Sequence, residues 1–465
     1  MNAPLPREPL ADHGPGRDRP LRITLISPKG PLYRHTGGIF TKSLRYMPLT
    51  FPTLKALIPA TIKTEVTCID EGIQEVDRGL QTDLVGMTVI TGTAMRAYEL
   101  ASGFRERGIP VVLGGPHVTL APEDAQPHAD SIVVGYAEEE WPRLLNDFVS
   151  GAMKPRYDQS PDLDLSGSPF PDRDVLPRRR YLTSHVFEAT RGCVHSCSFC
   201  VVPTAWGRKP YQKPVEHIVE DLRRQGSRKA IFVDLNIIAD KEYARRLFTA
   251  LIPLGIHWYG LATVLLCEDL PLLDLAAQSG CRGLLMGLES ISKSALGSTK
   301  KGFNDPDRYG EVVERLHARG ISLQGCFVFG LDDDEPDVFE RTVRFAVEAR
   351  IDLPRFAILT PFPGTPLYQK LDSENRILTR NWEIYDGQHV VFQPARMSVE
   401  KLSRGAKAAW EQAYSLRSIF ERLRYTPSPW PLALTTNLGY RYYARRLDRY
   451  YTCDWMVKDP ARTTF

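Results

Sequence analysis

The sequence has few cysteines, little net charge and no long apolar run. Its 465 residues include eight cysteines, too few for a disulfide scaffold, so we expect free thiols, metal ligands or catalytic groups in a reducing compartment. A formal net charge of +3 gives no support to nucleic acid or an anionic membrane as partner. Because no stretch of about 18 apolar residues occurs, we expect no membrane span. Residues 1–20 lack the apolar core of a signal peptide, which predicts a disordered tail and a cytoplasmic protein.

The length indicates more than one folded domain, and the 43% hydrophobic and 25% charged residues are ordinary for a globular protein. From residue 21 to 150, short apolar runs alternate with helical periodicity, which predicts an α/β fold of the doubly wound, Rossmann-like type. Its expected strands are Leu21–Ser27, Glu65–Asp70, Leu84–Ile90, Val111–Gly115 and Ser131–Gly135. Residues 151–182 are rich in Pro, Asp, Ser and Arg and are expected to form a linker or a strap that lies over the next domain.

A second α/β series over residues 183–390 predicts an incomplete (β/α)6 barrel of the TIM type, with its active site at the carboxyl ends of the strands. The expected strands are His185–Thr190, Ala230–Asn236, His257–Thr263, Gly283–Ser290, Leu323–Gly330 and Arg355–Pro361. Residues 391–465 become helical and then aromatic and basic, with 12 Lys and Arg against 5 Asp and Glu from residue 401 onward. This C-terminal helical extension is either a cap with solvated charges or a lid over an anionic substrate.

Three of the eight cysteines form a C-x3-C-x2-C group directly after the first expected barrel strand, namely Cys193, Cys197 and Cys200. Three thiolates can hold three irons of a [4Fe-4S] cubane, which leaves the fourth iron open to the amino and carboxylate groups of S-adenosylmethionine (SAM). The alternative is a zinc site. Zinc needs a fourth ligand, and although His195 lies within the loop, its spacing is not a zinc pattern.

With Phe199 as its aromatic residue, this motif resembles that of radical SAM proteins with an N-terminal cobalamin-binding-type domain, and the resemblance extends from about residue 21 to 450. It implies SAM contacts at successive strand ends, by Asp234 and Asn236, by Glu289, and by the glycine motif from Gly325 to Gly330. Residues 361–368 (PFPGTPLY) match a further signature of the family. Each feature also has a structural interpretation: helix capping for Asp234 and Asn236, a buried ion pair for Glu289, close packing for the glycines and a turn for PFPGTP.

In the resembled family the N-terminal domain binds cobalamin at the carboxyl edge of its sheet. The corresponding loops here are Ser27–Gly38, Thr91–Ala94, Gly114–His117 and Gly135–Glu138. Gly114, Gly115 and Gly135 are expected to let backbone amides approach a large ligand. His35 is a weak candidate for a cobalt ligand, because the aspartate of the D-x-H-x-x-G motif is replaced by Tyr33. A domain that has lost cobalamin and only shapes the substrate pocket is the alternative.

The resemblance implies a cobalamin-dependent radical SAM enzyme that methylates an unactivated carbon, using one SAM to remove a hydrogen atom and a second to methylate cobalamin. Its partners would be a small-molecule substrate and an external electron donor of the flavodoxin or ferredoxin type. One alternative is a radical SAM enzyme without cobalamin chemistry, which rearranges or cyclises its substrate or transfers a 3-amino-3-carboxypropyl group; it leaves a role open for the single cysteines Cys267, Cys281, Cys326 and Cys453. The other is a non-enzymatic iron–sulfur or corrinoid carrier. The substrate and the oligomeric state are left open.

Overall fold

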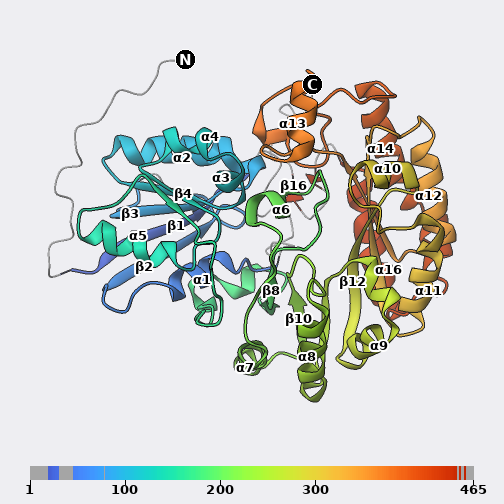
Figure 1. Ribbon diagram of the computed structural model, residues 1–465, viewed down its shortest axis with the longest axis horizontal. Helices are drawn as coiled ribbons and strands as arrows, with labels where there is room; N and C mark the ends of the chain where they lie inside the picture. Colours follow the sequence, from blue (N-terminus) through green and yellow to red (C-terminus); the bar gives the residue numbers. More distant parts are fainter. Residues whose placement is uncertain (1–18, 31–45, 78, 448–449, 452–454, 457–465) are drawn as a thin grey trace. The chain divides into compact units, whose positions relative to one another are not determined.

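The computed structural model describes residues 19–30, 46–77, 79–447, 450–451 and 455–456. These residues divide between two compact units (Figure 1). Unit 1 contains the described residues up to Ser184 together with residues 455–456, and unit 2 contains those from His185 to Tyr451. Each unit has its own sheet and its own hydrophobic core. The candidate residues His35 and Cys453 lie outside the described residues, as does most of the loop Ser27–Gly38.

Unit 1 is built on a six-stranded parallel sheet in the order β2-β1-β3-β4-β5-β6. The strands are β1 Leu21–Ser27, β2 Thr64–Asp70, β3 Leu84–Thr88, β4 Val111–Gly114, β5 Ser131–Val134 and β6 Arg156–Asp158. Its helices include α1 Thr50–Ala56, α2 Ala94–Glu106, α3 Pro116–Leu120, α4 Pro122–Ala125 and α5 Glu140–Val149. The order 2-1-3-4-5 is that of doubly wound folds, so the expected Rossmann-like fold is confirmed, and the chain reverses direction across the sheet between β1 and β3.

The segment 151–182 differs from the linker that we expected. Residues 156–158 add β6 beside β5, and the segment continues as part of unit 1. Leu163, Leu165, Leu176 and Tyr181 are buried, and the Tyr181 hydroxyl donates a hydrogen bond of 2.9 Å to Asp70. The high content of Pro, Asp and Arg concealed these apolar residues, whose burial holds the segment to the domain.

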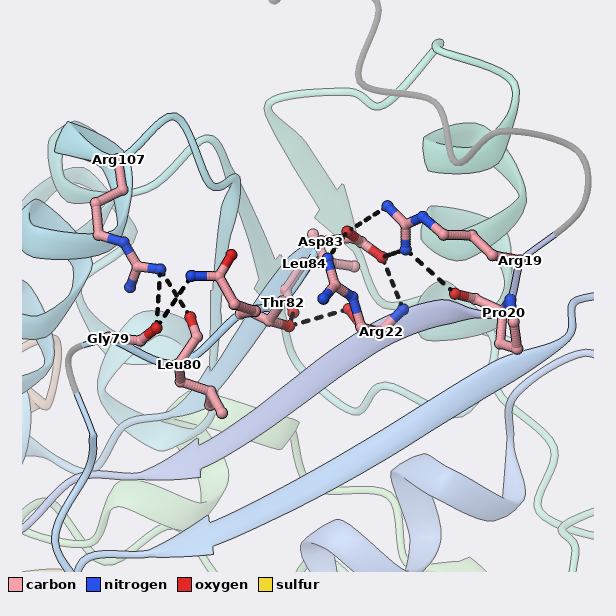
Figure 2. Close-up of polar contacts among 10 residues, drawn as sticks. Arg19, Pro20, Arg22, Gly79, Leu80, Thr82, Asp83, Leu84 and Arg107 are labelled. Atoms are coloured by element: carbon pink, nitrogen blue, oxygen red, sulfur yellow. Dashed lines mark hydrogen bonds and ion pairs between the residues drawn. The ribbon is translucent and has the colours of Figure 1, made fainter.

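Polar contacts fix the amino ends of β1 and β3 to each other (Figure 2). Asp83 accepts hydrogen bonds from the Arg22 backbone amide at 2.9 Å and from the guanidinium groups of Arg19 and Arg22. Burial raises the pKa of Asp83, but these donors outweigh it and hold that pKa below its usual value. The Thr82 hydroxyl donates to the Arg22 carbonyl at 3.0 Å.

Unit 2 contains a six-stranded parallel sheet in which the strands follow chain order, β7-β10-β11-β12-β13-β14. The strands are β7 Val186–Phe187, β10 Lys229–Phe232, β11 His257–Leu261, β12 Cys281–Glu289, β13 Ser322–Phe329 and β14 Leu353–Ile358. The helices between them are α7 Val215–Gln225, α8 Lys241–Leu251, α9 Leu270–Gln278, α10 Lys293–Ser298, α11 Tyr309–His317 and α12 Val338–Glu348. Six successive βα units confirm the incomplete barrel (Figure 1).

The chain continues after β14 through α13 (Pro366–Ser373) into the helices α14 (Val399–Ala413), α15 (Leu416–Leu423) and α16 (Trp430–Ala444), and then the short strands β15 (Tyr450–Tyr451) and β16 (Trp455–Met456). Helix α14 covers the edge strand β14. Trp410 Nε1 donates to the Phe356 carbonyl at 2.9 Å, and the Tyr414 hydroxyl donates to the Pro354 carbonyl at 2.8 Å. These side chains occupy carbonyls that an open edge would expose.

The C-terminal helices are more than a cap with solvated charges. Arg422 is fully buried and donates to the carbonyls of Ile351, Asp352 and Ala413 and to Asn437 Oδ1. This arginine therefore joins α15 and α16 to the amino end of β14. None of the helices within the described ranges combines the length and the apolarity needed to cross a bilayer.

Candidate active site

The cysteine loop is closed at its base by a small antiparallel pair. Strand β8 (Thr190–Arg191) pairs with β9 (Tyr211–Gln212), so residues 192–210 form a loop with fixed ends. Gly192 has φ 86°, and a Cβ there would lie 2.7 Å from the Lys209 carbonyl oxygen. A side chain at position 192 would therefore push apart the two ends of the loop.

Hydrogen bonds from distant segments hold the three cysteines in place. The Ser198 amide donates to the Thr299 carbonyl at 3.0 Å, and the Ser198 carbonyl accepts from the Leu367 amide at 3.0 Å. The Cys200 amide donates to the Cys197 carbonyl at 3.1 Å, immediately before helix α6 (Val201–Trp206). The PFPGTP turn therefore has a structural role, because it places the start of α13 against the cysteine loop.

The thiols are partly or fully enclosed. Cys197 is buried, whereas Cys193 and Cys200 are half-buried. Burial raises the pKa of the Cys200 thiol to about 11 and also raises that of Cys197, although the nearby charge of Lys301 opposes both shifts. Among the described residues, no three His, Cys, Asp or Glu side chains converge as the ligands of one metal ion do. The assignment of a cluster rests on the C-x3-C-x2-C spacing of Cys193, Cys197 and Cys200 in the sequence.

Asp234, which follows β10, serves the protein backbone. Its carboxylate accepts hydrogen bonds from the amides of Ala189 and Thr190 and from the Thr190 hydroxyl. The residue is 1% exposed, and burial raises its pKa to about 6 despite these donors. The expected alternatives for Asp234 were SAM binding and helix capping, but its contacts anchor the strand that leads into the cysteine loop.

Asn236 and Thr263 present unused polar atoms at the carboxyl ends of β10 and β11. Asn236 is 2% exposed, and its Nδ2 lies 4.0 Å from Cys193 Sγ as a weak donor. Neither Asn236 Oδ1 nor Thr263 Oγ1 has a hydrogen-bond partner within the described part of the chain, although both atoms are buried. A buried oxygen without a partner costs about 1–3 kcal/mol, so such atoms near a cluster site indicate a place for a polar ligand.

Glu289 ends β12 at a bulge and forms a buried ion pair. It has φ 65°, and its Oε1 lies 2.6 Å from Lys301 Nζ. Burial lowers the pKa of Lys301, but the Glu289 carboxylate outweighs this and holds it above its usual value. A Cβ on Gly287 would lie 2.1 Å from Glu289 Oε1, so this glycine makes room for the pair. Asn304 Nδ2 supports the same turn by donating to the carbonyls of Gly287 and Leu288.

The glycines of the fifth barrel strand pack against protein atoms. A Cβ on Gly325 would lie 3.1 Å from side-chain carbons of Leu288 and Ile351. At Gly330, which has φ 100°, it would lie 2.9 Å from Leu402 of α14. The Gly330 amide donates to Asp334 Oδ2 at 2.8 Å. Both glycines therefore have a packing role, which was the structural alternative for these positions.

At the carboxyl edge of unit 1, the expected glycines also face protein. A Cβ on Gly115 (φ 101°) would lie 2.8 Å from the Val89 amide nitrogen, and one on Gly135 (φ 90°) would lie 2.5 Å from Gln159 Cβ. The Gly135 amide donates to Thr119 Oγ1 at 2.9 Å. Gly114 meets only ordinary contacts at 3.7 Å. The backbone at Gly115 and Gly135 is thus fixed against neighbouring loops, and the Gly135 amide is already used within the protein.

A buried hydrogen-bonded group lies behind the loops that follow β3 and β4. His117 is fully buried, with Nε2 3.1 Å from Asp124 Oδ2 and Nδ1 3.3 Å from Thr91 Oγ1. The Tyr98 hydroxyl donates to the same Asp124 oxygen at 2.7 Å. Because both ring nitrogens are engaged, His117 is not available to cobalt. In the described loops that follow β3 and β4, the cobalamin expected of this domain would therefore be held without His117 as a ligand.

Three polar residues of unit 2 were not identified from the sequence, namely Thr263 after β11, and Lys301 and Asn304 beside the turn after β12. Thr263 was predictable in part, since it ends the third expected barrel strand, at the edge where barrels place their sites. Lys301 and Asn304 lie in the irregular segment after α10, where no local pattern indicates which side chain turns inward. Their roles became visible only through their contacts with Glu289, Gly287 and Leu288.

Comparison with known proteins agrees with both units. The Radical SAM superfamily model matches residues 187–346, the B12 binding domain model matches residues 57–145, and a Domain of unknown function (DUF4070) matches residues 365–433. Bacteriochlorophyllide d C-12(1)-methyltransferase of Chlorobaculum tepidum is 31% identical over 358 residues, covering 75% of this chain and 78% of that protein. The C-8(2)-methyltransferase of the same organism is 31% identical over 364 residues, covering 74% and 80%.

A solved structure shares the fold at lower identity. TsrM of Kitasatospora setae, a radical S-adenosylmethionine methyltransferase with cobalamin and a [4Fe-4S] cluster bound, aligns with a TM-score of 0.63 at 18% identity, covering 77% of this chain and 78% of that one. With both family models matched in order and two relatives aligned over most of their length, the chain belongs to the cobalamin-dependent radical SAM methyltransferase family, whose cofactors are a [4Fe-4S] cluster, SAM and cobalamin.

Proposed function

We propose that this enzyme transfers a methyl group from SAM to an unactivated carbon of a small molecule, with Cys193, Cys197 and Cys200 as the cluster ligands. The observation that carries the proposal is the unpartnered, buried Oδ1 of Asn236, whose amide nitrogen lies 4.0 Å from the Cys193 sulfur. This oxygen is an acceptor placed beside the cysteine group, where the ammonium group of SAM would be a matching donor.

When bound, the cluster supplies the electron that cleaves SAM, and cobalamin supplies a carrier for the methyl group. The chain's own residues hold the site. Asn236 and Thr263 would accept or donate hydrogen bonds to SAM, and the Glu289–Lys301 pair keeps the turn after β12 in shape beside them. Asp234 keeps the entry to the cysteine loop fixed, so that the reacting groups stay in register.

The likeness to two bacteriochlorophyllide d methyltransferases supports methyl transfer to carbon over the alternative radical SAM reactions. We keep the substrate at the level of a small molecule, because one fold hosts many substrates. The electron would come from a small external carrier of the flavodoxin or ferredoxin type.

The test is mass spectrometry of the nucleosides formed from SAM by the reduced, anaerobically reconstituted protein, with and without cobalamin. We expect 5′-deoxyadenosine, joined by S-adenosylhomocysteine only when cobalamin is present. Methylthioadenosine that is indifferent to cobalamin would overturn the proposal in favour of aminocarboxypropyl transfer. No cleavage of SAM under any condition would revive the non-enzymatic carrier.

Variants can show whether SAM cleavage depends on Asn236 and whether any of the four single cysteines takes part in the chemistry. Asn236→Ala should raise the SAM concentration needed for half-maximal cleavage by about tenfold, the effect of one buried hydrogen bond to a charged group. Ser variants of Cys267, Cys281, Cys326 and Cys453 should leave the nucleoside products unchanged. A changed product in any of the four would favour the rival chemistry in which a single thiol takes part.

A further inference from the structure

The outer face of α16 is apolar. The helix packs onto unit 2 through Ala433, Asn437 and Ala444, all buried. On its opposite side, Leu432 is 53% exposed, Leu438 42% and Tyr442 43%. A surface helix of a globular protein ordinarily turns charged and polar side chains outward, so apolar residues on both faces call for a partner other than water.

Exposed aromatic residues extend this face at its amino end. Phe420 of α15 and Trp430 of α16 have their ring centroids 6.0 Å apart, and both side chains are about half exposed, as is that of Tyr425. Aromatic rings of this type favour the boundary between water and lipid, where one part of the ring is solvated and the rest is apolar. We name the set Phe420, Trp430, Leu432, Leu438 and Tyr442 the α16 face.

The charges in α16 and in the segment that joins it to α15 have one sign. Residues 424–446 contain four arginines and no aspartate or glutamate. Arg424 and Arg445 are exposed, and the Arg446 guanidinium lies 4.1 Å from the centre of the Tyr442 ring. The neighbouring Glu421 in α15 is paired with Arg417 at 2.8 Å. This basic region is part of the excess of Lys and Arg from residue 401 onward, which acidic residues elsewhere cancel in the total charge of the chain.

We propose that the α16 face is a peripheral docking surface for an anionic lipid bilayer. Apolar side chains flanked by arginines match a membrane interface, where aliphatic and aromatic groups enter the acyl boundary while cations meet lipid phosphates. A second copy of this chain on the same face would bring arginines against arginines. An acidic globular partner would satisfy the arginines but would have to cover the apolar residues between them.

The docking surface lies away from the cysteine loop. The α16 side chain Tyr440 accepts a hydrogen bond from Gln324, near the amino end of β13, and Asn437 of α16 donates to the Asp352 carbonyl before β14. The three cysteines follow β7 and belong to the carboxyl ends of the strands. The proposal therefore concerns anchoring, and it is independent of methyl transfer.

The test is flotation of the full-length protein with vesicles of phosphatidylcholine alone and of phosphatidylcholine mixed equally with phosphatidylglycerol. We expect binding to the anionic vesicles, little binding to the neutral ones, and weakening as salt is raised. The double variant Leu432→Glu, Leu438→Glu should lower the bound fraction at least tenfold. Arg445→Gln should weaken binding about fivefold, the contribution of one cation near an anionic surface.

The matched control is Leu378→Glu, which places the same change on a leucine of unit 2 that is 51% exposed outside the α16 face. It should bind as the wild type does, and thermal unfolding should show that all variants are folded. Equal binding to both vesicle types, or retained binding in the double variant, would overturn the proposal. Absence of binding to any vesicle would also overturn it, and so would self-association or binding to an acidic protein without vesicle binding. Because the assay needs no SAM or reductant, its outcome is separate from that of the methyl-transfer test.

Discussion

The carboxyl edges of the two sheets differ in how their polar groups are used. In unit 1, Thr91, His117 and Asp124 bond to one another, and Gly115 fits closely against a neighbouring loop. In unit 2, buried oxygens of Asn236, Thr263 and Asp334 have no partner among the described residues. These unit 1 groups are therefore satisfied by one another, whereas the three unit 2 residues keep unused hydrogen-bonding capacity.

The difference indicates how each edge would hold its cofactor. Each unpartnered oxygen in unit 2 costs about 1–3 kcal/mol, which a ligand with matching donors removes on binding. In unit 1, Thr91, His117 and Asp124 already bond to one another and give no such gain, so we expect other contacts to supply the affinity for cobalamin. Substitutions at the two edges should then act differently, by loss of ligands in unit 2 and by distortion of the backbone in unit 1.

The largest effect should follow removal of a cluster ligand. Cys197→Ala leaves two thiols, too few to hold the cubane, and we expect SAM cleavage to fall to background together with iron content and the visible absorption of the cluster. Cys326→Ala is the control, since this half-buried thiol lies in β13 outside the cysteine loop. Full iron content in Cys197→Ala would show that the site is wrongly assigned.

The second largest effect should follow loss of the buried ion pair between Glu289 and Lys301. Lys301→Met leaves Glu289 as an uncompensated buried charge, which should cost about 3–5 kcal/mol of unfolding free energy. The control is Lys300→Met, because Lys300 is the neighbouring residue and is exposed. Chemical unfolding followed by fluorescence measures both. If the two variants were equally stable, Glu289 would not depend on Lys301.

A backbone substitution in unit 1 should have a smaller but distinct effect. Gly115→Ala introduces a Cβ at positive φ and 2.8 Å from the Val89 nitrogen, which should cost about 2–4 kcal/mol and weaken cobalamin binding. Gly114→Ala is the matched control, because its Cβ would meet only ordinary contacts. Absorbance titration with cobalamin and thermal unfolding check the pair. If the two variants had the same stability and the same affinity for cobalamin, the backbone at Gly115 would not contribute to cobalamin binding.

The sequence was sufficient for the architecture because strand burial in α/β folds leaves a strong apolar pattern. The strand Leu21–Ser27 was predicted with its observed bounds, and the six barrel strands appear in the predicted order. The burial of apolar residues in segment 151–182 was not indicated by the sequence, because Leu163 and Leu176 are isolated apolar residues whose burial depends on tertiary contacts that no local period records.

The candidate site, too, could be predicted from the sequence only in part. Spacing alone identified the cysteine group, but it could not distinguish Asp234, which is used by the backbone, from Asn236, which has a free acceptor. They lie two residues apart after one strand, and both types of side chain can accept hydrogen bonds. Asp234 accepts from Ala189 and Thr190, beside the β8–β9 pair, which joins residues about 20 positions apart and has no local signal.

The smallest expected effect is a pH dependence of stability that arises from Asp334, one of the three unit 2 residues with an unpartnered oxygen. Asp334 accepts from the amides of Gly330 and Leu331 with one oxygen, and burial raises its pKa to about 6 from an ordinary 3.8. A raised carboxyl pKa means that stability from the protonated form is complete below about pH 4 and is lost as pH rises through 6. Asp334→Asn keeps the acceptor and removes the charge, so it should abolish this decline and add about 1–3 kcal/mol at neutral pH, measured by chemical unfolding across the range.

Asp337→Asn, at an exposed aspartate on the same loop, should retain the decline of the wild type. If Asp334→Asn declined equally, the unpartnered oxygen of Asp334 would carry no cost, and the contrast between the two edges would rest on Asn236 and Thr263 alone.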